Sequence, residues 1–159
     1  VNATSLNHDD RTRFRLENLG YIFQDYALVP ELSALENVMV PLLMQGKTTE
    51  EATEISRASL ARIGLSHREN NLPSQMSGGE QQRVSIARAV AHNPKILFAD
   101  EPSANLDNVS SESVMDVFKD LHNQGQTIIM VTHEPEYTAY CDRVIHLSDG
   151  QIVDDKRKI

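Results

Sequence analysis

The segment Ile96-Leu97-Phe98-Ala99-Asp100-Glu101 decides the fold class of this chain. Four consecutive apolar residues run directly into two acidic ones. Such an unbroken apolar run is typical of a parallel strand that is covered on both faces. Ile128 to Val131 repeats the pattern and runs through Thr132 into His133, and Tyr21-Ile22-Phe23 runs into Gln24. We therefore expect an α/β fold built on a parallel sheet.

Helix-start signals lie between and beside these strands. Three times a serine or threonine stands three residues before a glutamate, which is the capping-box pattern: Ser33 with Glu36, Thr48 with Glu51, and Ser77 with Glu80. The other expected elements are a strand from Val1 to Leu6, helices from Asp9 to Asn18 and from Val109 to Gln124, and a hairpin of Arg143–Leu147 with Gln151–Asp154 that turns at Asp149-Gly150. We divide the chain into a partial α/β core (1–25), a helical subdomain (26–92) and a second part of the core (93–159).

Composition excludes several classes of protein. The formal net charge is −8, which argues against nucleic acid or an anionic membrane surface as the main partner. Cys141 is the only cysteine, so we expect a reduced, partly buried thiol and no disulfide framework. No apolar run approaches the ~20 residues of a membrane span. The chain starts with Val1 and not with Met, from which we expect an N-terminal truncation.

Polar side chains follow each of the three apolar strands. In an open parallel sheet, ligands bind beyond the carboxyl ends of the strands. We therefore expect Gln24, Asp100, Glu101 and His133 to meet at one edge. Asp100 and Glu101 are expected to point to opposite sides, so that one holds a cation and the other meets a nucleophilic water. Mg²⁺ with a nucleoside triphosphate suits such a site. The simpler alternative is a set of polar strand exits with no shared role.

Ser77-Gly78-Gly79 begins a predicted helix. Two glycines in a first helical turn cost about 1 kcal/mol each relative to alanine. They are explained if an anion approaches the backbone N–H groups at the positive end of the helix. The alternative is a plain capping box. Asp107 likewise suits the N-cap of the next helix, with or without a further role.

One glycine-lysine-threonine sequence imitates the end of a phosphate-binding loop and is rejected. Gly46-Lys47-Thr48 has the right three residues, but Pro41 stands where the first glycine of the pattern belongs. Thr48 is also needed as a helix cap. The other five histidines show no metal-ligand spacing, and we assign them to the surface or to structural contacts.

Taken together, these motifs resemble the ATP-binding cassette (ABC) ATPases, and more narrowly the subunits paired with permeases of the lipoprotein-release and macrolide-export type. The segments that carry the resemblance are Tyr21 to Gln24 (Q-loop), Leu28 to Val38, Met76 to Arg83 (signature), Ile96 to Glu101 (Walker B), Ser103 to Asp107 (D-loop) and Thr132-His133 (switch histidine). The resemblance covers nearly the whole chain. Small departures are Met76 and Glu80, where leucine and glutamine are commoner.

The resemblance implies a P-loop NTPase-like fold and a role for each matching residue. Gln24 and Asp100 would bind Mg²⁺, Glu101 would polarise the attacking water, and His133 would bind the γ-phosphate. Ser77 and Gly79, with Gly78 and Glu80 beside them, would face the ATP of a second subunit, and Asp107 would cross the dimer interface at this nucleotide site. The implied partners are a transmembrane permease and a paired ATPase subunit, at the inner face of the cell membrane, with no nucleic acid.

The large departure is the absence of a Gly-x-x-x-x-Gly-Lys-Ser/Thr loop (Walker A) from the 159 residues. We therefore expect this chain alone to bind ATP weakly or not at all. Two other functions stay open from the sequence: a soluble ABC-type ATPase without a permease, and a non-catalytic relic that uses only the dimer surface.

Overall fold

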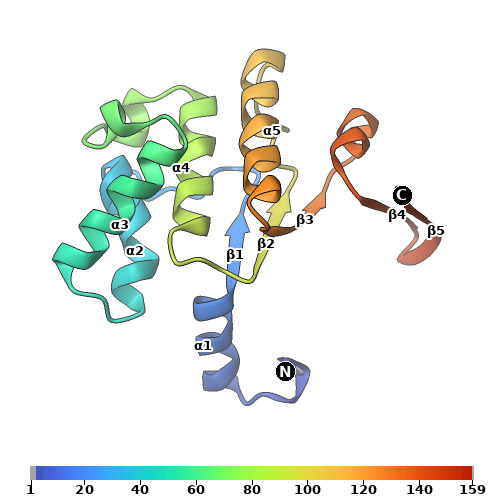
Figure 1. Ribbon diagram of the computed structural model, residues 1–159, viewed down its shortest axis with the longest axis horizontal. Coiled ribbons are helices and arrows are strands. Elements are labelled where there is room, and N and C mark those ends of the chain that lie inside the picture. The colour runs from blue at the N-terminus through green and yellow to red at the C-terminus, as the bar shows by residue number, and fades with distance from the viewer. Residues whose placement is uncertain (1–2, 159) are drawn as a thin grey trace.

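The computed structural model describes residues 3–158 and shows an α/β fold (Figure 1). The chain forms short 3₁₀ helices, α-helices and strands in this order: η1 (Ala3–Ser5), α1 (His8–Asn18), β1 (Leu19–Ile22), α2 (Ala34–Met44), α3 (Thr49–Arg62), η2 (Ser66–Arg68), η3 (Pro73–Gln75), α4 (Gly78–Val90), β2 (Ile96–Asp100), α5 (Asn108–Asn123), β3 (Thr127–Val131), η4 (Pro135–Tyr140), β4 (Arg143–Ser148) and β5 (Gln151–Arg157).

The three strands that decided the fold class are parallel neighbours in the order β1-β2-β3. Ile22 pairs with Ala99, and Asp100 pairs with Val131, so the three carboxyl ends reach the same edge of the sheet. In Figure 1 the arrows of β1 and β2 point toward the end of the molecule at which α4 and α5 begin. The predicted parallel arrangement is confirmed.

One face of this sheet is packed and the other is open. Ile22, Leu97 and Ala99 point to the side of α4 and α5 and belong to the main hydrophobic core. On the opposite face Tyr21 is 44% exposed and Val131 59% exposed. The prediction that both faces are covered is therefore wrong for residues 3–158. An apolar strand predicts that both faces are covered, but it does not show which segment covers each face.

The helical subdomain has its own core. Val38 of α2, Leu60 of α3 and Val84 of α4 are fully buried in one cluster. All three predicted capping boxes form, at Ser33, Thr48 and Ser77. In each, the side-chain oxygen of the cap accepts a backbone N–H three residues on.

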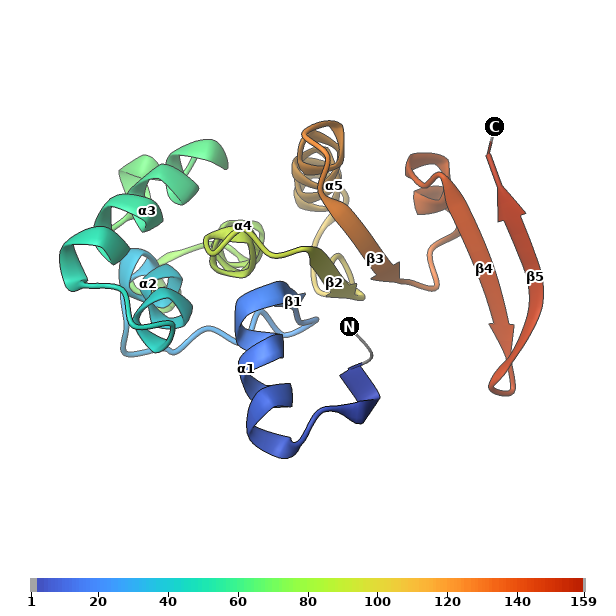
Figure 2. The same cartoon turned by 60° about the horizontal axis from the view of Figure 1, so that its bottom comes forward.

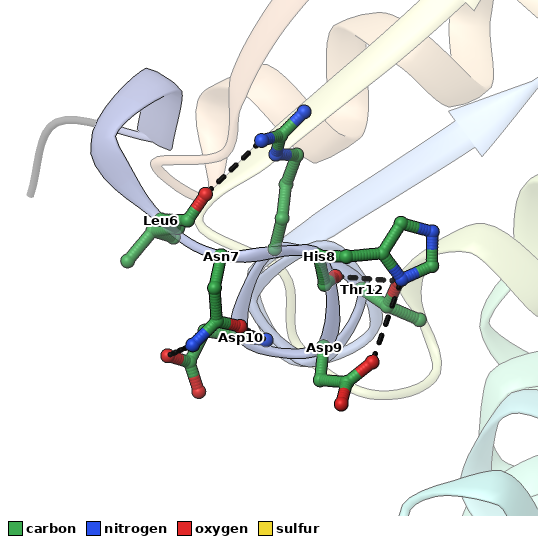
Figure 3. Close-up of polar contacts among 7 residues, drawn as sticks. Leu6, Asn7, His8, Asp9, Asp10 and Thr12 are labelled. Carbon is green, nitrogen blue, oxygen red and sulfur yellow. Dashed lines mark hydrogen bonds and ion pairs between the residues drawn. The ribbon is translucent and has the colours of Figure 1, made fainter.

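The two ends of the chain carry smaller units. Asn7 caps α1: its Oδ1 accepts the Asp10 N–H at 2.8 Å, and its Nδ2 donates to Asp10 Oδ2 at 2.7 Å (Figure 3). The strand predicted from Val1 to Leu6 is wrong where it can be checked, because Ala3–Ser5 is a 3₁₀ turn; Val1 and Asn2 lie outside the described residues. Antiparallel β4 and β5 form the predicted hairpin and lie beyond β3 (Figure 2).

No helix within residues 3–158 has both the length and the apolar content needed to cross a membrane.

Candidate functional site

A side-chain hydrogen bond at the carboxyl edge of the sheet joins Glu101 to His133. Glu101 follows the last residue of β2, and its N–H donates to the Val131 carbonyl at 2.9 Å. His133 lies two residues beyond the end of β3. Glu101 Oε1 lies 2.8 Å from His133 Nδ1, so residues 32 positions apart in sequence share a hydrogen bond.

The two members of this pair differ in solvent exposure, and the carboxylate of Glu101 changes the pKa of His133. The hydrogen bond to Glu101 and the charge of that carboxylate raise the pKa of His133, with a smaller contribution from Glu134. The imidazole is 72% exposed and the carboxylate only 20%. The second carboxylate oxygen, Glu101 Oε2, is buried and has no hydrogen-bond partner among the described residues. A buried carboxylate oxygen without a donor is costly, so this oxygen is positioned to accept a hydrogen bond from a small donor such as water.

Asp100 and Glu101 do not alternate as adjacent strand residues. Asp100 ends β2 and is exposed, with its Oδ2 3.5 Å from the Tyr21 hydroxyl. Glu101 has a φ of 45°, in the left-handed region that side chains rarely adopt. The alternation on which we predicted opposite sides therefore stops at Asp100. The direction of the Glu101 side chain is therefore set by this backbone turn and not by strand geometry.

Gln24 is tied to the loop after β2 through its backbone. Asn105 Nδ2 donates to the Gln24 carbonyl at 3.0 Å, and the Tyr26 hydroxyl donates to the Asn105 carbonyl at 3.3 Å. Sequence reasoning gave no role to Asn105 or Tyr26, since neither carries a signal that marks such a bridge. The structure thus brings Gln24 next to the loop that leads from Glu101 to Asp107.

Hydrogen bonds of the Glu80 carboxylate to Ser77 and Arg68 fix the start of α4. Glu80 Oε2 accepts the Ser77 N–H at 2.8 Å, and Oε1 accepts from Arg68 Nε at 2.8 Å. The backbone hydrogen bond from Ser77 and the Arg68 guanidinium lower the pKa of Glu80. Both carboxylate oxygens of Glu80 are therefore already engaged within the subdomain.

The two glycines of α4 have a packing reason that the sequence did not show. A Cβ at Gly78 would lie 2.8 Å from the Tyr26 hydroxyl oxygen, and one at Gly79 would lie 3.0 Å from Ser110 Cβ. Close approach of α4 to the turn after β1 and to α5 thus favours small residues here, since a Cβ would displace the Tyr26 side chain or crowd Ser110. This preference exists independently of any bound anion.

Asp107 is the N-cap of α5, as the structural alternative predicted. Its Oδ1 accepts the Ser110 N–H at 3.0 Å, and its Oδ2 accepts from the Ser110 hydroxyl at 2.8 Å. These hydrogen bonds lower the pKa of Asp107. The side chain remains at the surface, beside the start of α4.

The donor set fits a magnesium ion that is shared with phosphates. Residues 3–158 contain no group of three or more His, Cys, Asp or Glu side chains placed to hold a metal. Mg²⁺ commonly uses only one or two carboxylates, with water and substrate phosphates as its other ligands. The exposed carboxylate of Asp100 and the amide of Gln24 match that requirement.

Away from this edge, Cys141 is half-buried, and burial raises the pKa of its thiol.

Comparison with known proteins identifies the family. The model of the ABC transporter family matches residues 1–104. An uncharacterized ABC transporter ATP-binding protein of Methanocaldococcus jannaschii is 46% identical over 152 residues, which are 96% of this chain and 68% of that protein. The lipoprotein-releasing system ATP-binding protein LolD of Aquifex aeolicus is 43% identical, with the same two coverages. The macrolide export ATP-binding/permease protein MacB of Chlorobium luteolum is 45% identical, but the chain spans only 24% of it.

A solved structure extends the match to three dimensions. The ATP-binding cassette MJ0796, in a dimeric post-hydrolysis state bound to ADP and Pi, superposes with a TM-score of 0.83 at 37% identity. The alignment covers 96% of this chain and 68% of that one. The predicted P-loop NTPase-like fold and the resemblance to lipoprotein-release and macrolide-export ATPases are confirmed. The chain belongs to the ABC transporter family of ATP-binding proteins.

Proposed function

We propose that this chain is part of the ATP-hydrolysing subunit of an ABC membrane transporter, where ATP-driven dimerisation is coupled to movement of a partner permease. The observation that carries the proposal is the Glu101–His133 pair, held at 2.8 Å on the carboxyl edge of a parallel sheet. The relatives and the fold of the chain are those of ATP-binding cassettes. The residues that follow its parallel strands are of the types that hydrolysis of a phosphoanhydride needs.

Glu101 is the proposed general base. His133 binds Oε1, whereas Oε2 is buried with no partner within residues 3–158, so Oε2 is the oxygen left to accept a proton from water. His133 uses Nδ1 for Glu101 and keeps Nε2, 3.6 Å from Glu134 Oε1, for a phosphate oxygen. Its raised pKa favours the cationic form, which suits an anionic ligand.

Asp100 and Gln24 are the proposed holders of Mg²⁺, which when bound would neutralise phosphate charge. Gln24 lies in the turn after β1, and its backbone is fixed by Asn105. A ligand-dependent shift of this turn would be passed to the helical subdomain, where we place the permease contact. The proposed division of the chain is into core segments 1–25 and 93–159 and a helical subdomain 26–92.

The start of α4 is the proposed contact with the ATP of a second subunit. Ser77 and Asp107 are both exposed, at the starts of α4 and α5. The backbone N–H groups of Gly78 and Gly79 would bind phosphate at the positive end of α4, with Glu80 fixing the turn. The assembly would be a dimer that works on the inner face of the cell membrane, without nucleic acid.

The test is Glu101→Gln in the protein as its own gene encodes it, purified with its permease. Turnover of ATP should fall at least about a hundredfold, because the amide cannot take a proton, and an ATP-bound dimer should accumulate. Glu136→Gln, which removes an exposed carboxylate from η4, is the matched control and should keep wild-type turnover. Equal turnover in wild type and Glu101→Gln would exclude Glu101 as the base.

A further inference from the structure

Two turns at the active edge adopt backbone conformations that are unfavourable for their residues. Tyr26 and Ala27, directly after Gln24 and Asp25, have φ values of 64° and 48°. Glu101 has a φ of 45°. Left-handed backbone is disfavoured for residues with a Cβ, so surrounding contacts must maintain it.

Both turns are held by side chains of the same helix, α4. The Arg88 guanidinium donates to the Ala27 carbonyl and, at 3.0 Å, to the Tyr26 carbonyl. Six residues earlier on α4, Gln82 Nε2 donates to the Pro102 carbonyl at 2.6 Å, next to Glu101. One helix therefore contacts the turn that carries Gln24 and the turn that carries Glu101.

The burial of Gln82 and Arg88 indicates that these hydrogen bonds are the reason for polar side chains at both positions. Gln82 is fully buried, and its Oε1 has no partner among the described residues. An apolar residue of similar size would fill the space without that unsatisfied oxygen, so the donated hydrogen bond is what favours glutamine here. Arg88 is half-buried; burial lowers its pKa, and the Asp25 carboxylate opposes that shift.

We infer that Arg88 and Gln82 are positioning residues: Arg88 fixes the Gln24–Ala27 turn, Gln82 fixes the Glu101–Pro102 turn, and α4 couples both turns to its start at Ser77. The catalytic consequence rests on the proposed function, whereas the positioning itself does not. A movement of Ser77 to Gly79 would thus reach the magnesium-binding and the water-activating residues together.

The first test is amide hydrogen exchange, measured residue by residue by NMR on the chain. The reporters are the N–H groups that close each turn: Tyr26 and Ala27 in the first, Ala104 and Leu106 in the second. Arg88→Met should speed exchange in the first turn by about ten- to a hundredfold, the range for loss of hydrogen bonds from a charged donor, and leave the second unchanged. Gln82→Met should speed exchange in the second turn and leave the first turn unchanged.

Arg83→Met is the matched control for exchange, since Arg83 lies on the same helix but donates to Ser113 of α5 at 2.9 Å. It should leave both turns at wild-type exchange. If Arg88→Met does not fold, Arg88→Lys replaces it and should produce a smaller increase at the same two amides. Wild-type exchange in the turn that each variant targets, or an equal increase in both turns, would overturn the inference.

The second test separates positioning from packing in the protein with its permease. Arg88→Met should lower kcat for ATP by at least about tenfold with KM changed less than about threefold, because the turn is misplaced and the nucleotide contacts remain. A change confined to KM would contradict the positioning role. A wild-type protein without ATPase activity would refute the proposed function and leave the exchange result standing.

Discussion

Replacing Gly20 by alanine is expected to destabilise the chain by forcing α4 away from the sheet. Gly20 is buried in β1, and a Cβ there would lie 2.4 Å from the Ala89 carbonyl oxygen and 2.8 Å from Leu97 Cδ1. The nearer atom belongs to the backbone of α4 and cannot rotate away. The helix must therefore shift, and the packing between α4 and β1 must loosen.

The magnitude follows from two opposing terms. Overpacking a well-packed core costs about 1–3 kcal/mol, and a backbone clash belongs at the upper end, about 3 kcal/mol. Alanine restricts the unfolded chain more than glycine does, which returns about 0.4–1 kcal/mol. The net loss in the free energy of unfolding is about 2 kcal/mol. With a urea m value of about 2 kcal/mol/M, the midpoint of unfolding should fall by about 1 M.

The assay is urea unfolding of wild type and variants, followed by circular dichroism. Gly46→Ala is the comparison, because Gly46 has a φ of 85° with no atom within 4 Å of an added Cβ. It tests backbone strain without a clash and should cost about 1 kcal/mol. Adding Leu97→Ala to Gly20→Ala should not restore stability, since the Ala89 carbonyl remains. A Gly20→Ala loss below that of Gly46→Ala would refute the reasoning.

Three further outcomes are expected. The stabilisation that protonated His133 gains from Glu101 should be fully present below about pH 6.5 and be lost as the pH rises through the raised pKa of His133; an NMR titration in which His133 titrates below the unfolded value contradicts this. Ser77→Ala should lower the free energy of unfolding by about 1 kcal/mol through loss of the α4 cap, whereas exposed Ser74→Ala should change it by less than about 0.5. Calorimetric titration of the 159-residue chain with Mg-ATP should show weak or no binding, and micromolar affinity would defeat that expectation.

The sequence predicted the elements because local signals and tertiary packing agree. Capping boxes act within four residues, so Ser33, Thr48 and Ser77 could be read directly. The Asp149-Gly150 turn has φ values of 48° and 75°, as its residue types favour. The parallel edge followed from where apolar runs end, which is also a local signal.

Features that depend on distant partners were not predictable. The pattern before Asp100 gave no sign that Glu101 would leave the strand in a left-handed turn. The sequence of the α4 start suggested an anion site or a plain capping box and gave no sign of packing, because the proximity of its glycines to Tyr26 and Ser110 is created by the fold. Arg88 was expected to be an ordinary helix residue and Gln82 only a part of the Met76–Arg83 signature, since their acceptors lie 61 and 20 positions away.

Gly20 packs against α4, which carries both positioning side chains, so Gly20→Ala tests the coupling as well as the packing. Ala89, which the added Cβ would push, is the neighbour of Arg88 on this helix. A displaced α4 should loosen both turns together, whereas Arg88→Met should loosen only the turn at Tyr26. Gly20→Ala should therefore speed amide exchange at Ala27 and at Ala104 alike. A variant that loses stability with exchange unchanged at both amides would show that α4 can move without carrying the two turns.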